Sequence, residues 1–161
     1  MTTARFSTRP FTLNILLILP VAMLFVGTTA FATLGESEAS IDSDATALHG
    51  THLTTSVNGQ IRARQLKTTK AVIKQYTNAS GQVYALSWQG VKHPDLSVLM
   101  GAYFPEYSSA LKARGSSSLR RNSTVTTSQA VIHLSGVPRH MSGLVYVPAL
   151  LPSEVKTGDL R

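Results

Sequence analysis

The spacing of apolar and polar positions predicts a short helix at the start of the folded part of the chain. Ile41, Ala45 and Leu48 recur at helical spacing within residues 36–48, and acidic residues stand near its beginning, where they suit the positive end of a helix. Gly50 follows at a place where glycine commonly ends a helix. The apolar face is narrow, so we expect this helix to pack on another element.

From residue 51 to residue 89 the apolar period changes towards that of strands. Ile61 and Ala63 alternate with Arg62 and Arg64, which is typical of a strand with one buried face. Two further apolar runs, residues 71–76 and 83–88, are joined by turn-forming residues at positions 78–81. These two runs predict a β-hairpin.

Within that hairpin the second strand alternates most clearly. Tyr84, Leu86 and Trp88 stand two residues apart, so we expect their side chains to share one face.

A second helical pattern follows the hairpin. His93 and Pro94 stop the strand, and Asp95 is placed to accept hydrogen bonds from the first turn of a helix over residues 95–113. Gly101 and Pro105 interrupt this pattern and predict a kink or two short helices. We favour a helix packed on a sheet over an aromatic ligand groove. The apolar stripe consists of Leu96, Leu99, Met100, Tyr103, Phe104, Tyr107 and Leu111.

The last third of the chain predicts a basic, serine-rich loop over residues 112–124 and two strands around residues 125–134 and 141–148. Residues 135–138 supply the turn between these strands, and the prolines at 148 and 152 end regular pairing before a loop-like tail. The predicted fold is α+β: an antiparallel sheet of about five strands, with two helical segments packed on one face.

The N-terminus has the pattern of a secretory signal peptide. Arg5 and Arg9 precede an apolar run over residues 15–27, and small residues stand at Ala30 and Ala32. The run is shorter than the roughly 20 residues of a membrane-spanning helix. We therefore predict a signal peptide over residues 1–32, cleavage near Ala32, and a single domain over residues 33–161 in the periplasm or outside the cell.

Charge and composition narrow the function further. The chain of 161 residues carries 15 Lys and Arg against eight Asp and Glu, and loss of Arg5 and Arg9 with the signal would reduce the net charge from +7 to +5. The absence of cysteine excludes disulfides, thiolate metal sites and a cysteine nucleophile. A hydrophobic fraction of 43% excludes a disordered chain.

No catalytic or metal motif emerges. The chain has many serines but no Gly-x-Ser-x-Gly elbow, so a Ser–His–Asp site rests only on residues that would have to meet in the fold, such as His93, Asp95 or His140. Asp42 and Asp44 are two apart, so a helix points them in different directions. We predict no cofactor.

Histidine spacing gives only two candidate pairs. His49 and His52 stand three apart, and His133 and His140 flank a predicted hairpin turn, across which they could face each other. A metal ion needs three or four ligands. We favour ordinary polar residues and predict no metal site.

Basic residues gather on the first two predicted strands. If Arg62 and Arg64 share the solvent face with Lys74, they form a cationic surface that attracts an anionic polymer or phospholipid headgroups. A merely solvated face is the interpretation we favour. We do not expect nucleic acid as a partner for an exported chain without a binding motif.

Three blocks of residues resemble one family. They are residues 33–48, beginning with Thr33-Leu34-Gly35; residues 76–104, with GQVYALSWQG at 81–90, PDL at 94–96 and LMGAYF at 99–104; and MSGLVYVP at 141–148. The chain is similar to the exported proteobacterial proteins called domain of unknown function 2844. Val91 and Met141 depart from the usual pattern, which has proline and an aromatic residue there.

This resemblance implies export in a Gram-negative bacterium and one small domain, and no established activity or catalytic residue transfers with it. We expect a non-catalytic binding or structural module whose partner is an envelope component or protein, with membrane contact only transiently through the signal peptide. The alternatives are a small envelope hydrolase and a basic-surface binder of anionic polymer. Weak ligand-binding candidates are Arg62, Arg64, Lys74, Trp88 and Tyr103.

Overall fold

A computed structural model describes residues 34–59, 61–115 and 122–160. Its seven strands form one antiparallel sheet in the order β1-β2-β3-β4-β7-β6-β5. The strands are β1 (Thr51–Asn58), β2 (Ile61–Lys67), β3 (Ala71–Thr77), β4 (Val83–Gly90), β5 (Asn122–Thr126), β6 (Val131–Val137) and β7 (His140–Tyr146). The α+β class and the antiparallel sheet are confirmed, whereas the expectation of about five strands is wrong.

The two additional strands carry weak sequence signals. Every residue of β1 is exposed, so its sequence shows no buried alternation. The expected single strand over residues 125–134 is instead β5 and β6, joined by a turn in which Thr127 N donates to Ala130 O at 2.9 Å. The expected turn at residues 135–138 lies mostly inside β6, and the chain reverses near Arg139, whose φ is 69°.

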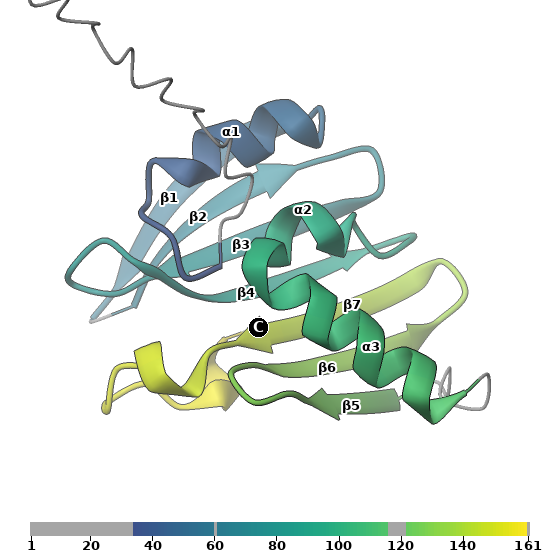
Figure 1. Ribbon diagram of the computed structural model, residues 1–161. Helices are drawn as coiled ribbons and strands as arrows, with labels where there is room; N and C mark the ends of the chain where they lie inside the picture. The colour runs from purple at the N-terminus through teal and green to yellow at the C-terminus, as the bar shows by residue number, and fades with distance from the viewer. Residues whose placement is uncertain (1–33, 60, 116–121, 161) are drawn as a thin grey trace, which may run out of the picture.

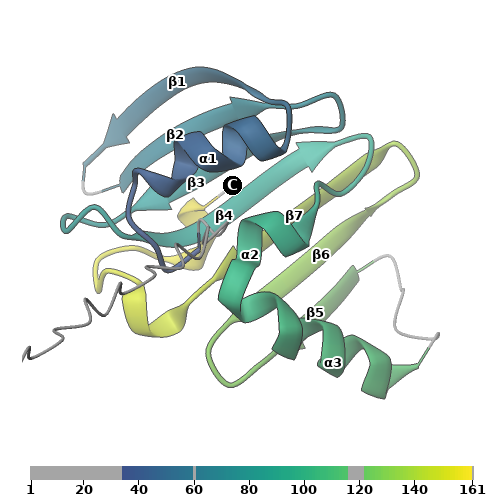
Figure 2. The same ribbon diagram turned by 45° about the horizontal axis from the view of Figure 1, so that its top comes forward.

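The three α-helices of the described residues lie on one face of the sheet, as Figures 1 and 2 show: α1 (Ser40–Ala47), α2 (Leu96–Met100) and α3 (Phe104–Arg114). The 3-10 turn η1 (Gly101–Tyr103) separates α2 from α3, which confirms the predicted interruption. Asp95 Oδ1 accepts a 3.0 Å hydrogen bond from Ser97 N and caps α2 as expected. The core beneath the helices includes Trp88, Leu99 and Met100.

The first helix starts later than its sequence pattern predicts. Ser37 forms an isolated antiparallel bridge with Gln82 just before β4, where Val83 N donates to Glu36 O and Glu38 N donates to Gly81 O. At the other end Gly50 N donates to Ala45 O at 2.8 Å, which closes α1 as expected. Backbone pairing with β4 thus replaces the predicted first helical turn.

The C-terminal segment covers part of the opposite face, which we call the far face. It contains the 3-10 turns η3 (Pro148–Leu150) and η4 (Thr157–Asp159), and Val155 and Leu160 pack on Tyr76, Tyr84 and Leu144. The C-terminal segment, which was expected to be a loop-like tail, therefore adds a layer with its own core to the far face.

Tyr84 belongs to this second core, so the expectation that it shares a face with Leu86 and Trp88 is wrong. The register of β3 and β4 shifts between Tyr76 and Thr77, leaving Tyr84 as an extra residue in β4. Such a bulge breaks the strict alternation of faces. Tyr84 and Ala85 both pack under the C-terminal segment.

Candidate functional site

Two parallel rows of side chains, which we call the polar rows, cross the far face beside the second core. Because residues paired across an antiparallel sheet share a face, the strand registers define both rows over six strands, from β2 to β5. The first row is Lys67, Val72, Gln89, Ser142, Ser135 and Asn122. The second row is Gln65, Lys74, Ser87, Leu144, His133 and Thr124.

A neighbouring row explains why only part of the far face is covered. Ala63, Tyr76, Ala85 and Tyr146 are paired in register across β2, β3, β4 and β7. These apolar and aromatic side chains form the floor on which the C-terminal segment packs. The polar rows begin where this apolar floor ends.

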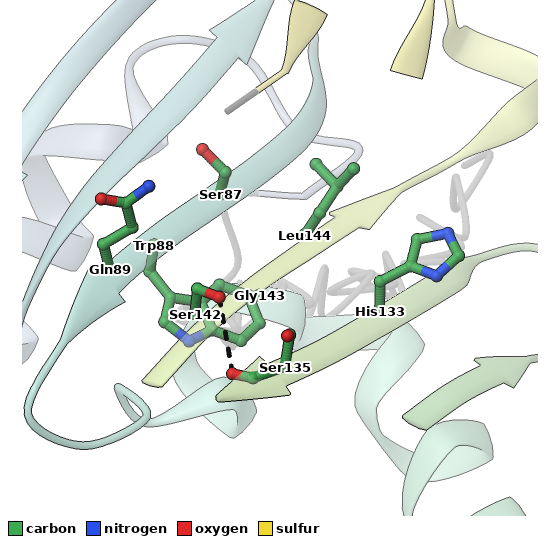
Figure 3. A pocket seen from close by; sticks show the side chains of 8 residues that line it. All are labelled: Ser87, Trp88, Gln89, His133, Ser135, Ser142, Gly143 and Leu144. Carbon is green, nitrogen blue, oxygen red and sulfur yellow. Dashed lines mark hydrogen bonds between the residues drawn. The ribbon is translucent and has the colours of Figure 1, made fainter. Parts of the chain in front are cut away.

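A hollow of about 260 Å³ lies in the middle of the polar rows. Figure 3 shows its lining side chains on β4, β6 and β7, with Ser87 and Gln89 on one side and His133 and Ser135 on the other. A second hollow of about 660 Å³ shares Gln89 and Ser142 with the first. Its lining also includes Val72, Gly90, Val91, Arg139, His140 and Met141.

Hydrogen bonds orient the hydroxyl groups of this site. Ser87 Oγ lies 3.1 Å from Tyr76 Oη, Ser142 Oγ donates to Ser135 O, and Ser135 Oγ donates to Asn122 Oδ1 at 2.7 Å. Each hydroxyl oxygen has further capacity to accept a hydrogen bond. The hollow in the rows therefore presents neutral groups that both donate and accept hydrogen bonds, held on strands.

His133 is fixed at the edge of the hollow. Its Nδ1 atom lies 2.9 Å from Thr124 Oγ1, and its ring stacks on Tyr146 with centroids 6.0 Å apart. The hydrogen-bond partner of this imidazole is thus a hydroxyl and not the carboxylate that a serine hydrolase would use.

The fold separates the charges of the molecule. None of the eight Asp and Glu lies in a described strand. Arg64 Nη2 lies 2.9 Å from Asp42 Oδ1, and Arg62 Nη1 lies 3.8 Å from Glu38 Oε2, so both arginines face the acidic residues in and before α1. Lys74 pairs with Gln65, the neighbour of Arg64, and therefore lies on the far face. The condition for one cationic surface, that Arg62 and Arg64 share a face with Lys74, is therefore not met.

Trp88 and Tyr103, two further candidates, have structural surroundings. Trp88 is 1% exposed, and its Nε1 donates to His93 Nδ1 at 3.0 Å. Burial lowers the pKa of His93. The half-buried Tyr103 packs against the main core and close to Gly35. Trp88 is among the residues that line the hollow (Figure 3), but a side chain that is 1% exposed offers no ring face on which a ligand can stack.

The residues suggested for a hydrolase are not brought together. His93 bonds with Trp88, whereas Asp95 bonds with Ser97, whose hydroxyl holds the pKa of that carboxyl below its usual value. His140 pairs with Val137 and His133 with Leu144, so these histidines do not face each other across the turn.

The other histidine pair does not form a metal site either. His52 Nε2 lies 3.1 Å from Asp42 Oδ1, while His49 ends α1 with a φ of 50°. Among the described residues, no three His, Cys, Asp or Glu side chains are grouped as metal ligands.

Sequence reasoning missed the polar rows, because their members come from strands that are distant along the chain. One signal was present: the strand-forming segments contain serine, glutamine and lysine but no Asp or Glu. The basic serine-rich loop falls partly at residues 116–121, outside the described residues.

The fold and the site define a class: a small α+β domain whose antiparallel sheet carries helices on one face and exposes polar rows on the other. The chain belongs to the family described as Protein of unknown function (DUF2844), whose model matches residues 30–160. No curated protein and no solved structure matches it. Within the described part of the chain, no helix has the length and apolar character needed to cross a membrane.

Proposed function

We propose that this protein is an exported, non-catalytic binding module of the Gram-negative envelope and that the polar rows are its binding surface. Residues 1–32 have the pattern of an export signal, and cleavage near Ala32 would release residues 33–161 into the periplasm or the medium. The partner would be an envelope component that lies across the strands.

One observation carries this proposal: the far face is covered over its apolar part, including Ser87 and Leu144 of the second row, and left open over the first row. Val155 and Leu160 are 5% and 0% exposed in the second core, whereas Gln89 and Ser135 are exposed. Hydrogen-bonding groups held on rigid strands around a hollow are a common basis for ligand binding. The hydroxyl partner of His133 supports binding over hydrolysis.

The experiment measures retention of the mature chain on separated envelope fractions: cell-wall sacculi, outer-membrane vesicles and soluble periplasmic polymers. The variant Ser135→Tyr/Ser142→Tyr fills the hollow without changing charge. We expect it to lose at least about tenfold in apparent affinity, because the rings displace the bound groups and remove two hydroxyls.

The matched control is Thr54→Tyr/Ser153→Tyr, which adds the same two rings at exposed positions on β1 and the C-terminal segment. We expect it to bind like the wild type. Circular dichroism and thermal unfolding establish that both variants fold. The proposal is contradicted if the mature chain is retained on none of the fractions. It is also contradicted if Ser135→Tyr/Ser142→Tyr and the control variant are retained equally well.

A further inference from the structure

We propose that the ligand of the polar rows is an acidic polysaccharide, a sugar chain that carries carboxylate groups. This inference rests on the proposed function, since it takes the polar rows as the binding surface, and it adds the chemical class of the ligand. Three properties of the surface carry it: the sign of its charge, its hydrogen-bonding groups and its shape.

The charge on this surface is positive without an opposing acid in the strands. Lys67 lies opposite Val72 in the first row, and Lys74 lies opposite Ser87 in the second row. Arg139 lines the adjoining hollow. The helix-covered face instead sets Arg62 and Arg64 against acidic partners. The polar rows, unlike the C-terminal segment with its Glu154 and Asp159, contain lysine and no acid, and they therefore favour an anionic ligand.

The hydrogen-bonding groups suit sugars. Seven of the twelve residues in the rows are Ser, Thr, Asn or Gln, which both donate and accept hydrogen bonds. Sugar hydroxyls have the same dual capacity, so they match such a surface better than a simple anion, which only accepts. Lys67 and Lys74 then supply the positive charges that pair with the carboxylate groups of the polysaccharide.

The shape of the surface favours an extended chain. The rows cross six strands, a distance of about 24 Å at the usual strand spacing. The hollow of about 260 Å³ interrupts this path and provides a place for one bulkier sugar unit. A polymer lying across the strands makes contacts at both the hollow and the lysines.

Two other anionic partners fit less well. A lipid surface is bound through apolar side chains that enter it, but only Val72 and Leu144 in the rows are apolar, and Leu144 is buried. Single-stranded nucleic acid is bound by stacking bases on aromatic rings. The twelve residues of the rows include no Phe, Tyr or Trp.

The test uses the mature chain with four defined probes: polygalacturonate, neutral dextran, phosphatidylglycerol vesicles and a single-stranded thymidine oligonucleotide. We expect polygalacturonate to bind best in isothermal titration and to weaken as salt rises, because part of the binding is electrostatic. The variant Lys67→Gln/Lys74→Gln should bind it about tenfold more weakly, from the two lost lysine contacts.

A charge-matched control separates a local effect from net charge. Arg62→Gln/Lys112→Gln removes two positive charges from β2 and α3, away from the polar rows. We expect this control to keep wild-type affinity. Because Lys74 is half-buried, thermal unfolding of both variants is measured to establish that they fold. The single variants Lys67→Gln and Arg139→Gln test the charge at exposed positions, where loss of the side chain does not disturb packing.

The outcomes distinguish the ligand class from the binding function. Equal binding of dextran and polygalacturonate, or stronger binding of vesicles or oligonucleotide, overturns the acidic polysaccharide while the polar rows remain a binding surface. Equal losses in the lysine variant and its charge-matched control also overturn it. If no probe binds and no envelope fraction retains the mature chain, both the ligand class and the proposed function are wrong.

Discussion

Gly143 lies directly opposite Trp88 in the pairing of β4 and β7, and the indole occupies the space beside its α-carbon. A β-carbon at position 143 would come within 2.1 Å of Trp88 Cζ2. Trp88 is almost fully buried in the core, so a shift of the ring would disturb the side chains packed around it. The absence of a side chain at this position is therefore a requirement of core packing.

We predict that Gly143→Ala lowers the free energy of unfolding by about 2 kcal/mol, because overpacking forces the indole or the strand to shift. Urea unfolding followed by tryptophan fluorescence measures this change. Gly158→Ala is the control, since a β-carbon there has nothing within 4 Å. Similar stability of the two variants would show that the core around Trp88 accommodates the added methyl group, which contradicts the prediction.

Asp44 is buried between α1 and the sheet, where Gln75 Nε2 donates to its Oδ2 at 3.3 Å. Its Oδ1 has no hydrogen-bond partner among the described residues. Burial raises the pKa of Asp44 to about 7. A carboxyl group in an unfolded chain has a pKa of about 3.9, so the folded state favours the protonated form.

The pKa of Asp44 predicts a pH-dependent stability. Its contribution is fully present below about pH 4 and is lost as the pH rises to about 7, because the unfolded chain releases this proton first. Asp44→Asn, which cannot ionise, should be similar to the wild type at pH 4 and more stable at pH 8 by about 4 kcal/mol, which corresponds to the rise in the pKa from about 3.9 to about 7. Urea unfolding across this pH range measures the difference, and a constant difference at all pH values would exclude the titration of Asp44.

At the scale of elements, the end of α1 uses an unusual residue. His49 has a φ of 50°, in the left-handed region, and its N–H donates to Thr46 O while Gly50 N donates to Ala45 O. Glycine usually holds the left-handed position of this helix ending.

We expect His49→Gly to raise the free energy of unfolding by about 0.5 kcal/mol, because glycine adopts this conformation without steric cost. Thermal unfolding measures it, with His140→Gly, at an exposed position where φ is not positive, as the control. A lower stability of His49→Gly than of the control variant would contradict this view of the helix end.

The C-terminal segment is a structural element because it covers Tyr76 and Tyr84. Burial raises the pKa of Tyr84 to about 12. Leu160 is fully buried in the same cluster, so Leu160→Ala should cost about 3 kcal/mol through lost burial and a cavity. Chemical denaturation measures this loss, and Glu154→Ala, at an exposed position, should change stability little. Equal stability of both variants would mean that the segment packs only loosely.

Some of the elements could be predicted from local sequence signals and others could not. The hairpin of β3 and β4 and the interrupted helix were predictable, because alternation, turn residues and a capping Asp95 act over a few residues. β1 was not predictable, because a fully exposed strand needs no apolar alternation. The position of Tyr84 depended on a bulge, which arises from pairing with another strand.

At the scale of the whole molecule, export is the prediction that can be tested first. Expressed in a Gram-negative host, the chain should yield a periplasmic or secreted form of 129 residues starting at Thr33, as measured by intact-protein mass spectrometry. Ala30→Arg/Ala32→Arg should block processing, because the cleavage site needs small residues. Ser40→Arg, outside that site, should be processed normally, and full-length chain in the cytoplasm would contradict the prediction.

The sequence by itself determined the apolar alternation of β2, the hairpin of β3 and β4, the segregation of acids away from the strands and the resemblance to the family. Only the tertiary structure decided that β7 lies between β4 and β6, which joins Gln89, Ser142 and Ser135 in one row. Alternation along a strand follows from local backbone geometry, whereas strand order and register depend on how the whole chain buries its apolar surface. The polar rows result from that packing.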